Sequence, residues 1–327
     1  MPRHPSIVLV TPALAKANIM LKNGNWQTAQ RWARMLRSAD YQVSIADSFT
    51  DQPADLLIAL HARRSAASVL RWHEQRPGQP LALVLTGTDL YGDIHNDPDA
   101  QRSLALADRL LVLHEQAITD LPTAHRHKAL VCLQSTPSRV TLPKMPQHLR
   151  ALMVGHLRDE KQPQTYFAAA RLLAHRTDIS LDHVGAPLDA LLGEQALATQ
   201  ATCPHYRWLN VLPHAATRAR IQRAHLLVHP SRVEGGAHVV IEAIRSGTPV
   251  IASRIAGNVG LLGSDYAGYF ELGDAAGLAA LIQRCHDDPT ILTALRAQCA
   301  ARASLFAPER ERATLITLML ALRKTRP

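Results

Sequence analysis

Short runs of apolar residues recur along the chain, separated by amphipathic stretches and polar turns. Within these runs the apolar residues are nearly continuous, which is typical of strands buried on both faces of a parallel sheet. Runs of this kind are bounded by Gly, Pro, Asp or Asn, the residues that favour turns. We expect strands over residues 7–10, 43–46, 56–60, 81–85, 110–113, 130–133, 149–154, 179–184, 226–228, 250–253 and 269–272.

Between these strands, apolar residues spaced three and four apart predict helices. We expect helices after Gly24 and near residues 63–75, 214–224, 274–286, 289–304 and 309–323. Strands that alternate with helices favour an α/β fold with doubly wound, Rossmann-like parallel sheets.

A proline-rich stretch without periodicity, residues 134–148, interrupts the alternation and is typical of a linker. We therefore expect two domains, residues 1–147 and 148–308, with a cleft between them. The last helix, within 309–325, is expected to cross back onto the first domain. The length of 327 residues agrees with two domains, because single cores stop growing near about 250–300 residues.

The composition is that of a globular protein, with 47% hydrophobic residues and a formal net charge of +9. A basic balance favours anionic partners, and here the charges are scattered rather than gathered in runs. Because a nucleic-acid-binding motif is also missing, we expect small anionic substrates and no nucleic acid.

The four cysteines are widely spaced, which predicts a reducing, cytoplasmic setting and no disulfide framework. The apolar run at residues 7–10 is shorter than a signal peptide requires, and no run is long enough to span a membrane. The 17 histidines do not show metal-ligand spacing, so we expect no metal.

One stretch after the strand at 226–228 carries the clearest chemistry. Glu234 precedes Gly235-Gly236-Ala237, and Glu242 follows inside the predicted helix. A glycine turn at the start of a helix presents backbone amides to a phosphate. Glu242 is placed to accept two ribose hydroxyls, and Glu234 lies beyond the phosphate, where a sugar would be held. This pattern predicts a nucleotide-sugar site.

Two cations follow the strand at 149–154, in the segment Gly155-His156-Leu157-Arg158-Asp159-Glu160-Lys161. Loops at the carboxyl ends of parallel strands meet at one edge of the sheet, so we expect Arg158 and Lys161 to face the glycine turn. Gly185, which follows the strand at 179–184, and Leu212, which precedes the helix near 214–224, are expected to contact the same donor, as is His156.

The first half offers a second set of polar residues at strand ends. A loop with Lys16, Lys22, Gly24 and Asn25 follows the first strand, and Asn25 is a suitable N-cap for the helix. Thr86, Gly87 and Thr88 follow the strand at 81–85, before Asp89, which is either a ligand neighbour or an N-cap. We expect the two loops to bind the acceptor, although an ordinary surface loop would also explain the first.

The C-terminal half resembles the donor domain of family-4-type glycosyltransferases of the GT-B fold. The resemblance lies in Pro230-Ser231, Glu234 with Glu242, and Gly247-Thr248-Pro249-Val250-Ile251-Ala252. It implies a nucleotide diphosphate sugar donor, with Glu242 on the ribose, Glu234 on the sugar, Gly236 and Ala237 on the diphosphate, and Lys161 as the diphosphate lysine. His156 stands where the family usually has arginine, and either His156 or Arg158 would take that role.

Stretches in both halves are similar to the selenosugar synthases of selenoneine biosynthesis. They are Asn23–Ala29, Leu85–Tyr91, Gly155–Lys161 and Gly257–Gly260. This likeness implies a UDP-sugar donor, with UDP-N-acetylglucosamine the expected one, and selenophosphate as acceptor, without a cofactor. Glu234, Lys161 and Arg158 would be the catalytic residues, and UDP and phosphate would be released with a 1-seleno-sugar.

Other functions stay open from the sequence. A GT-B glycosyltransferase with a carbohydrate or lipid acceptor, a UDP-sugar epimerase and a non-catalytic nucleotide-sugar-binding protein would each use the same donor residues. The stereochemical outcome and the oligomeric state are also open, since retention suits the family and a strong nucleophile allows inversion.

Overall fold

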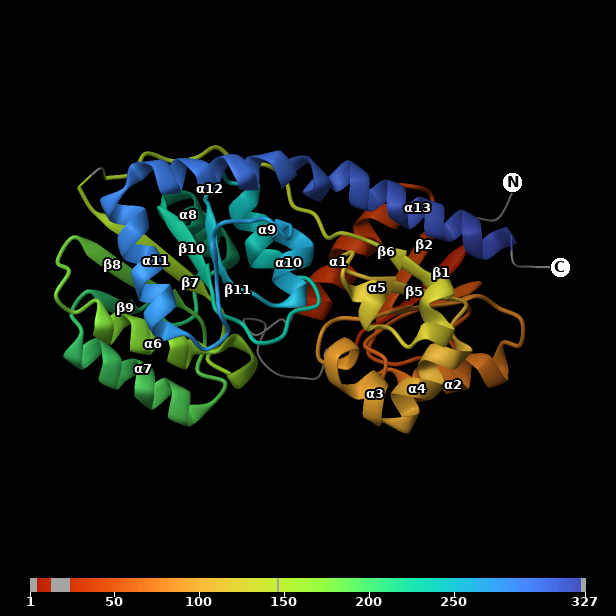
Figure 1. Ribbon diagram of the computed structural model, residues 1–327. Helices are drawn as coiled ribbons and strands as arrows, with labels where there is room; N and C mark the ends of the chain where they lie inside the picture. The colour runs from red at the N-terminus through yellow and green to blue at the C-terminus, as the bar shows by residue number, and fades with distance from the viewer. Residues whose placement is uncertain (1–4, 13–23, 146, 325–327) are drawn as a thin grey trace. The chain divides into compact units, whose positions relative to one another are not determined.

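The computed structural model describes residues 5–12, 24–145 and 147–324, and it divides into two compact units. The first unit contains residues up to Ser135 and the C-terminal segment from Pro308, and the second contains Thr136–Ala307. Each unit is a parallel sheet with helices on both faces, as the strand–helix alternation predicts (Figure 1).

In the first unit the strand order is β2-β1-β3-β4-β5-β6, all parallel among the described residues. The strands are β1 (Ser6–Val10), β2 (Gln42–Ala46), β3 (Leu56–Leu60), β4 (Leu81–Val84), β5 (Arg109–Val112) and β6 (Ala129–Val131). The helices are α1 (Gly24–Arg37), α2 (Ala66–Gln75), α3 (Ile94–Asn96), α4 (Pro98–Leu106), α5 (Ala117–Asp120) and α13 (Pro308–Lys324).

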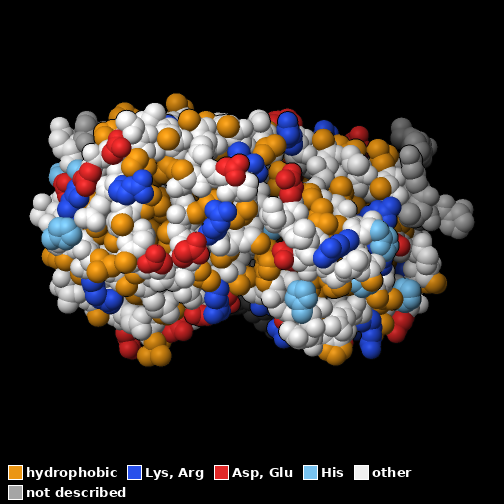
Figure 2. Space-filling view, in the orientation of Figure 1, with side chains coloured by type: hydrophobic (Ala, Val, Ile, Leu, Met, Phe, Trp, Pro, Cys, Tyr) orange, Lys and Arg blue, Asp and Glu red, His pale blue; other side chains and the backbone are white. Residues whose placement is uncertain are grey.

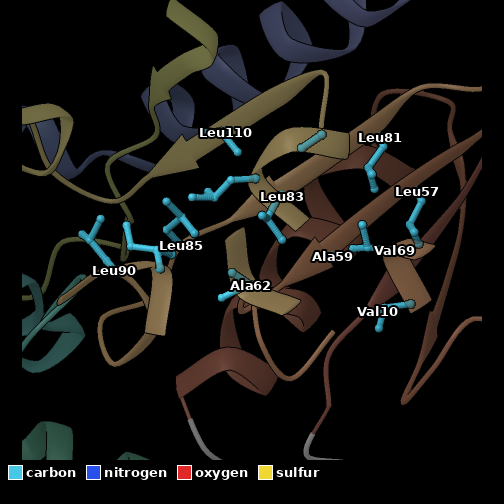
Figure 3. Packing of buried hydrophobic residues seen from close by; sticks show 14 of the residues in the cluster. Val10, Leu57, Ala59, Ala62, Val69, Leu81, Leu83, Leu85, Leu90 and Leu110 are labelled. Carbon is cyan, nitrogen blue, oxygen red and sulfur yellow. The ribbon is translucent and has the colours of Figure 1, made fainter. Parts of the chain in front are cut away.

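Two hydrophobic clusters hold this sheet, one on each face. On one face, side chains of β1, β3, β4 and β5 pack against α2 and α4 (Figure 3). On the other, alternate side chains of the same strands pack against α1 and α13. The buried carboxylate of Glu311 in α13 accepts hydrogen bonds from Arg31 Nε at 2.9 Å, from Trp32 Nε1 at 2.6 Å and from Ser135 N at 2.9 Å. The C-terminal helix is therefore an integral layer of the first unit.

In the second unit the strand order is β12-β11-β10-β7-β8-β9. The strands are β7 (Leu149–Val154), β8 (Ile179–Val184), β9 (Tyr206–Trp208), β10 (Leu226–His229), β11 (Val250–Ser253) and β12 (Tyr269–Phe270). The helices are α6 (Pro163–Leu172), α7 (Ala190–Thr202), α8 (His214–Arg223), α9 (His238–Ile244), α10 (Ala256–Leu262), α11 (Ala275–Asp287) and α12 (Pro289–Arg302). Neither β9 nor α7 is predicted by the spacing of apolar residues.

Residues 136–145 contain neither helix nor strand and belong to the second unit, although the sequence places the domain boundary at 147. Several hydrogen bonds attach this segment to the second unit, three of them along its length. Arg139 N donates to Arg245 O at 2.9 Å, Gln222 Nε2 donates to Val140 O at 2.7 Å, and Thr141 Oγ1 donates to Ser246 O at 3.0 Å. These hydrogen bonds set where the second unit begins, and the spacing of apolar residues along the sequence does not reveal them.

Candidate functional site

The strand order of the second unit reverses between β7 and β10, because the chain leaves β7 toward β8 and leaves β10 toward β11. In doubly wound sheets, ligands bind outside the carboxyl ends of the strands at such a reversal. The two loops there are Gly155–Lys161, after β7, and Pro230–Ala237, after β10. A backbone hydrogen bond of 2.9 Å from Arg232 N to Glu160 O joins them.

Lys161 and Glu234 meet at this reversal. Lys161 Nζ donates to Glu234 Oε1, and His229 Nε2 lies 3.1 Å from the same oxygen. Burial of the Glu234 carboxyl opposes its ionisation, but Lys161 and His229 outweigh burial and hold its pKa well below the usual range. Glu234 is therefore a buried carboxylate at neutral pH, fixed beside a cation at the edge where a ligand would bind.

Two glycines allow neighbouring backbone segments to pack closely against the two loops. A Cβ at Gly257, in the first turn of α10, would lie 2.2 Å from Glu234 O. A Cβ at Gly185, after β8, would lie 1.9 Å from Gly155 O. Both positions require glycine on steric grounds, so packing of the loops already explains Gly185, which the sequence assigned to donor binding.

Glu242 lies inside α9 with three nitrogen-bearing side chains around its Oε1 atom. His214 Nε2 is 2.7 Å away, Arg218 Nη1 is 3.3 Å away and His238 Nδ1 is 3.5 Å away. Burial raises the pKa of Glu242, but the hydrogen bonds with His214 and His238 and the Arg218 charge lower it further, to well below its usual range. The sequence-predicted ribose acceptor is thus a buried, ionised carboxylate.

The other predicted donor residues lie around these loops. Gly236 and Ala237 directly precede α9, and Leu212 lies half-buried before α8. His156 Nδ1 accepts a hydrogen bond of 3.0 Å from Ala186 N. Burial, with Arg158 and Lys161 nearby, lowers the pKa of His156, so this ring is neutral and does not supply the charge of an arginine.

Arg158 does not join the Lys161–Glu234 pair. Its side chain is 46% exposed, and its ion-pair partner is Glu160, with Nε 3.8 Å from Oε2. An exposed guanidinium held this loosely is able to turn toward an incoming anion. The structure thus brings together Lys161 and Glu234 of the predicted catalytic residues and leaves Arg158 at the rim.

In the first unit, Asp89 organises the loop after β4. Its Oδ1 accepts from Thr86 N at 2.8 Å and Gly87 N at 3.0 Å, and its Oδ2 accepts from Ala62 N at 2.9 Å. An N-cap accepts from amides that follow it, whereas Asp89 accepts from amides that precede it, so the N-cap alternative is wrong. Asp89 instead fixes the shape of the Thr86–Thr88 loop.

His61 is a candidate that the sequence analysis missed. It follows β3, next to β1 where the strand order of the first unit reverses. Its φ is 75°, in the left-handed region, and its ring is buried, with Nε2 3.0 Å from Thr88 Oγ1. Strained backbone of this kind is concentrated at functional sites. Burial lowers the pKa of His61 although Asp89 and Asp93 oppose this, so the ring is a neutral hydrogen-bonding group.

The α1 end of the predicted acceptor site is described in part. Gly24 and Asn25 both lie within α1, so Asn25 is not its N-cap. Thr28 Oγ1 donates to Gly24 O at 2.9 Å and accepts from Gln134 Nε2 at 2.7 Å. Lys16 and Lys22, which the sequence assigned to the same loop, lie outside the described residues.

His229 and His214 were also missed as site residues, because histidines are frequent in this chain. The usable signal is position: His61 directly follows a buried strand, and His229 ends one. Among the described residues, no group of three or more His, Cys, Asp or Glu side chains is arranged to hold a metal ion. In the same part of the chain, no helix is both long and apolar enough to cross a membrane.

Residues 138–305 match the sequence family described as glycosyl transferases group 1. A curated relative, D-inositol 3-phosphate glycosyltransferase 1 of Catenulispora acidiphila, is 30% identical over 227 residues, which are 61% of this chain and 51% of the relative. The chain therefore spans about half the length of that relative.

Solved structures share the fold over nearly the whole chain. Sucrose-phosphate synthase from Thermosynechococcus elongatus has a TM-score of 0.79 at 18% identity, covering 98% of this chain and all of that one. Anabaena Alr3699/HepE in complex with UDP and glucose has a TM-score of 0.72 at 16% identity, covering 97% of this chain and all of that one. These neighbours show that the two parallel-sheet units form an α/β GT-B fold.

Proposed function

The chain belongs to the group 1 glycosyl transferases, and we propose that it transfers the sugar of a UDP-sugar to selenophosphate. The observation that carries the donor half of the proposal is the Lys161–Glu234 pair at the strand reversal of the second unit. Similarity to a structure solved with UDP and glucose supports UDP as the nucleotide.

At the donor site, the residues divide by charge. Lys161, with Arg158 at the rim and the amides of Gly236 and Ala237, would face the diphosphate. Glu242 would hold the ribose hydroxyls, and Glu234 would accept hydroxyls of the sugar. Cations and amides aimed at a departing UDP stabilise the charge that develops on it, which is the largest single term in many enzymes.

The acceptor half of the proposal rests on the similarity of Asn23–Ala29, Leu85–Tyr91 and Gly155–Lys161 to the selenosugar synthases. In the first unit, Thr86–Thr88 and His61 supply hydroxyl, amide and imidazole groups at the sheet edge, and Arg63 adds an exposed cation. Such groups suit a small anion. The basic net charge of +9 also favours two anionic substrates.

Transfer of the sugar to selenophosphate requires little general acid–base catalysis by the protein. Selenium of selenophosphate forms a bond to the anomeric carbon while the bond from that carbon to UDP oxygen breaks. Water then cleaves the selenium–phosphorus bond and releases phosphate, which leaves a 1-seleno-sugar. The selenium lone pair is nucleophilic without prior loss of a proton, so a general base is not required. N-acetylglucosamine is the proposed sugar, and the cytoplasm is the proposed compartment.

One observation favours a second candidate acceptor. The curated relative is named for D-inositol 3-phosphate, a small polyol that carries a phosphate. A phosphorylated polyol would use the same anion-binding groups of the first unit but would attack through a hydroxyl, which needs a base. The two candidates differ in this requirement and in their products.

An acceptor screen with mass detection tests the proposal. Purified protein is incubated with UDP-N-acetylglucosamine and, in separate arms, selenophosphate, thiophosphate, phosphate, inositol 3-phosphate or no acceptor. We expect release of UDP and a 1-seleno-sugar in the selenophosphate arm, and a slower 1-thio-sugar with thiophosphate. UDP release no faster than in the arm without acceptor would overturn the selenophosphate assignment.

Variants then separate binding from turnover. Lys161→Met is expected to lower kcat by more than it raises KM for the UDP-sugar, because Lys161 faces charge that grows in the transition state. Arg284→Gln, an exposed change on α11, is the matched control and should leave both constants unchanged. If kcat fell only by the factor by which KM rose, Lys161 would not stabilise the leaving group.

A further inference from the structure

A basic cavity of about 480 Å³ lies in the second unit, at the opposite sheet edge from Lys161. It is lined by residues at the amino ends of β7 and β8, by residues around β9 and by the segment that precedes β7. β7 is six residues long, so about 20 Å of strand separates this cavity from the carboxyl edge. The cavity is therefore a separate feature from the donor site.

Its lining is rich in positive charge and contains no acidic residue among those described. Four side chains are cationic: Lys144, Arg150, Arg207 and Arg223. On the face shown in Figure 2, by contrast, Lys and Arg side chains are interspersed with Asp and Glu. The concentration of one sign of charge in this cavity is thus a local property.

The carboxylate of Asp182, which pairs with two of these arginines, does not neutralise this charge. Asp182 is 1% exposed and serves three arginines at once: Arg207 Nη2 at 2.7 Å, Arg220 Nη1 at 3.4 Å and Arg150 Nε at 3.8 Å. Of these three arginines, Arg150 and Arg207 line the cavity, so the single charge of Asp182 leaves at least one of their two positive charges uncompensated. Lys144 and Arg223 add two more.

Three buried nitrogens of lining residues have no hydrogen-bond partner among the described residues: Lys144 Nζ, His205 Nε2 and Arg150 Nε, the last lying 3.8 Å from Asp182. A buried ammonium without a partner is costly, because it has lost water and gained nothing in exchange. Burial and the nearby Arg296 lower the pKa of Lys144 to about 8, which leaves it mostly charged at neutral pH. Burial, together with Lys144 and Arg150, also lowers the pKa of His225. An anion bound in the cavity would supply the negative charge that these basic groups lack.

We propose that this cavity binds a small polyphosphate anion, such as pyrophosphate or the polyphosphate of a nucleotide, at a site distinct from the donor site. Several uncompensated cations call for a ligand with more than one negative charge, and phosphate oxygens accept from both guanidinium and ammonium groups. A cavity of about 480 Å³ is of the size that holds small molecules. The inference does not depend on the proposed function.

The anion would also fix the segment that leads into β7. Lys144 belongs to this segment, while Arg207 and Arg223 belong to β9 and α8. A ligand that contacts all three would add a link to the hydrogen bond that already joins the segment to α8, Gln222 Nε2 to Val140 O. We therefore expect binding to raise the unfolding temperature of the second unit.

Calorimetric titration with pyrophosphate tests the site. The donor site also has groups that bind a diphosphate, so each titration is made with wild-type protein and with Lys161→Met. Pyrophosphate should bind Lys161→Met at the cavity with an affinity close to that of the wild-type cavity. Lys144→Met and Arg223→Gln should each weaken binding at the cavity by about tenfold or more. Arg284→Gln, an exposed arginine elsewhere in the same unit, should change nothing.

A second readout separates a binding role from a structural one. Without pyrophosphate, Lys144→Met should melt no lower than wild type, since it removes an unpartnered buried cation. With pyrophosphate, wild type should gain unfolding temperature and Lys144→Met should gain little. Unchanged affinity in Lys144→Met, or loss of all pyrophosphate binding in Lys161→Met, would overturn the proposal. So would tighter binding of a single-stranded oligonucleotide than of pyrophosphate through Lys144 and Arg223, because the cavity would then serve nucleic acid.

Discussion

Replacing Glu234 by glutamine keeps the shape of the side chain and removes its charge. Lys161 Nζ and His229 Nε2 both lie against this carboxylate, and the Lys161 and Glu234 side chains are 17% and 9% exposed. Breaking a buried ion pair by removing one partner costs about 3–5 kcal/mol. We expect Glu234→Gln to lower the free energy of unfolding of the second unit by about 3 kcal/mol, at the low end because Lys161 is partly able to reach water.

A double-mutant cycle gives the coupling between the two side chains. Lys161→Met alone leaves Glu234 with His229, and the double variant leaves no unpaired charge of this pair. The double variant should therefore lose about 2 kcal/mol less unfolding free energy than the two single variants lose together. Urea unfolding followed by circular dichroism measures all four proteins.

The same two loops supply a matched control. Arg232 Nη2 lies 2.5 Å from Asp159 Oδ2, but these side chains are 47% and 56% exposed. Solvent screens such a pair, so the cycle with Arg232→Gln and Asp159→Asn should give a coupling below about 1 kcal/mol. If the Lys161–Glu234 coupling were as small as this one, burial would not have made the pair strong, and the reasoning would be refuted.

Three further changes test the surroundings of the two sites. Gly185→Ala should lower the free energy of unfolding by about 2–3 kcal/mol, because its Cβ would lie 1.9 Å from Gly155 O. Gly155→Ala is the control and should cost under about 1 kcal/mol, because its Cβ would meet nothing closer than 3.5 Å. Similar losses for the two variants in urea unfolding would contradict the steric argument. Asp89→Ala should cost about 3 kcal/mol in the same assay, since it leaves amides of the Thr86–Gly87 turn without an acceptor, and a loss under about 0.5 kcal/mol would show that the loop holds without it. Burial lowers the pKa of His183 from 6.5 to about 4, so the unfolded chain binds the extra proton between these values; unfolding free energy should be full above pH 6.5 and fall by up to about 1.4 kcal/mol per pH unit toward pH 4, and His183→Gln should flatten this profile.

The strands of the sheets could be predicted from the sequence because parallel strands are short, apolar and bounded by turn residues. β7 and β8 have the predicted bounds, Leu149–Val154 and Ile179–Val184. β9 was missed because Tyr206–Trp208 is three residues long with a charged centre, and its place in the sheet comes from pairing with β8. A pattern read along the chain does not register pairing of this kind.

Part of the candidate site could also be predicted from the sequence, because its residues follow predicted strands and flank a glycine turn. Glu234, Glu242 and Lys161 stand at fixed spacings from glycines and strands, and the structure places Lys161 on Glu234 across 73 residues of sequence. The histidines that complete these contacts, His229 and His214, carry no local signal of their own. Their role depends on which loops the strand order brings together.

The central claim is that the Lys161 loop holds the diphosphate of the donor at the strand reversal of the second unit. Isothermal titration of UDP and of uridine into wild type and Lys161→Met tests it most directly. The account predicts that Lys161→Met weakens UDP by about tenfold or more and uridine by less than about twofold, because only UDP carries the charge that Lys161 meets. Equal weakening of both ligands, or no weakening of UDP, would contradict it.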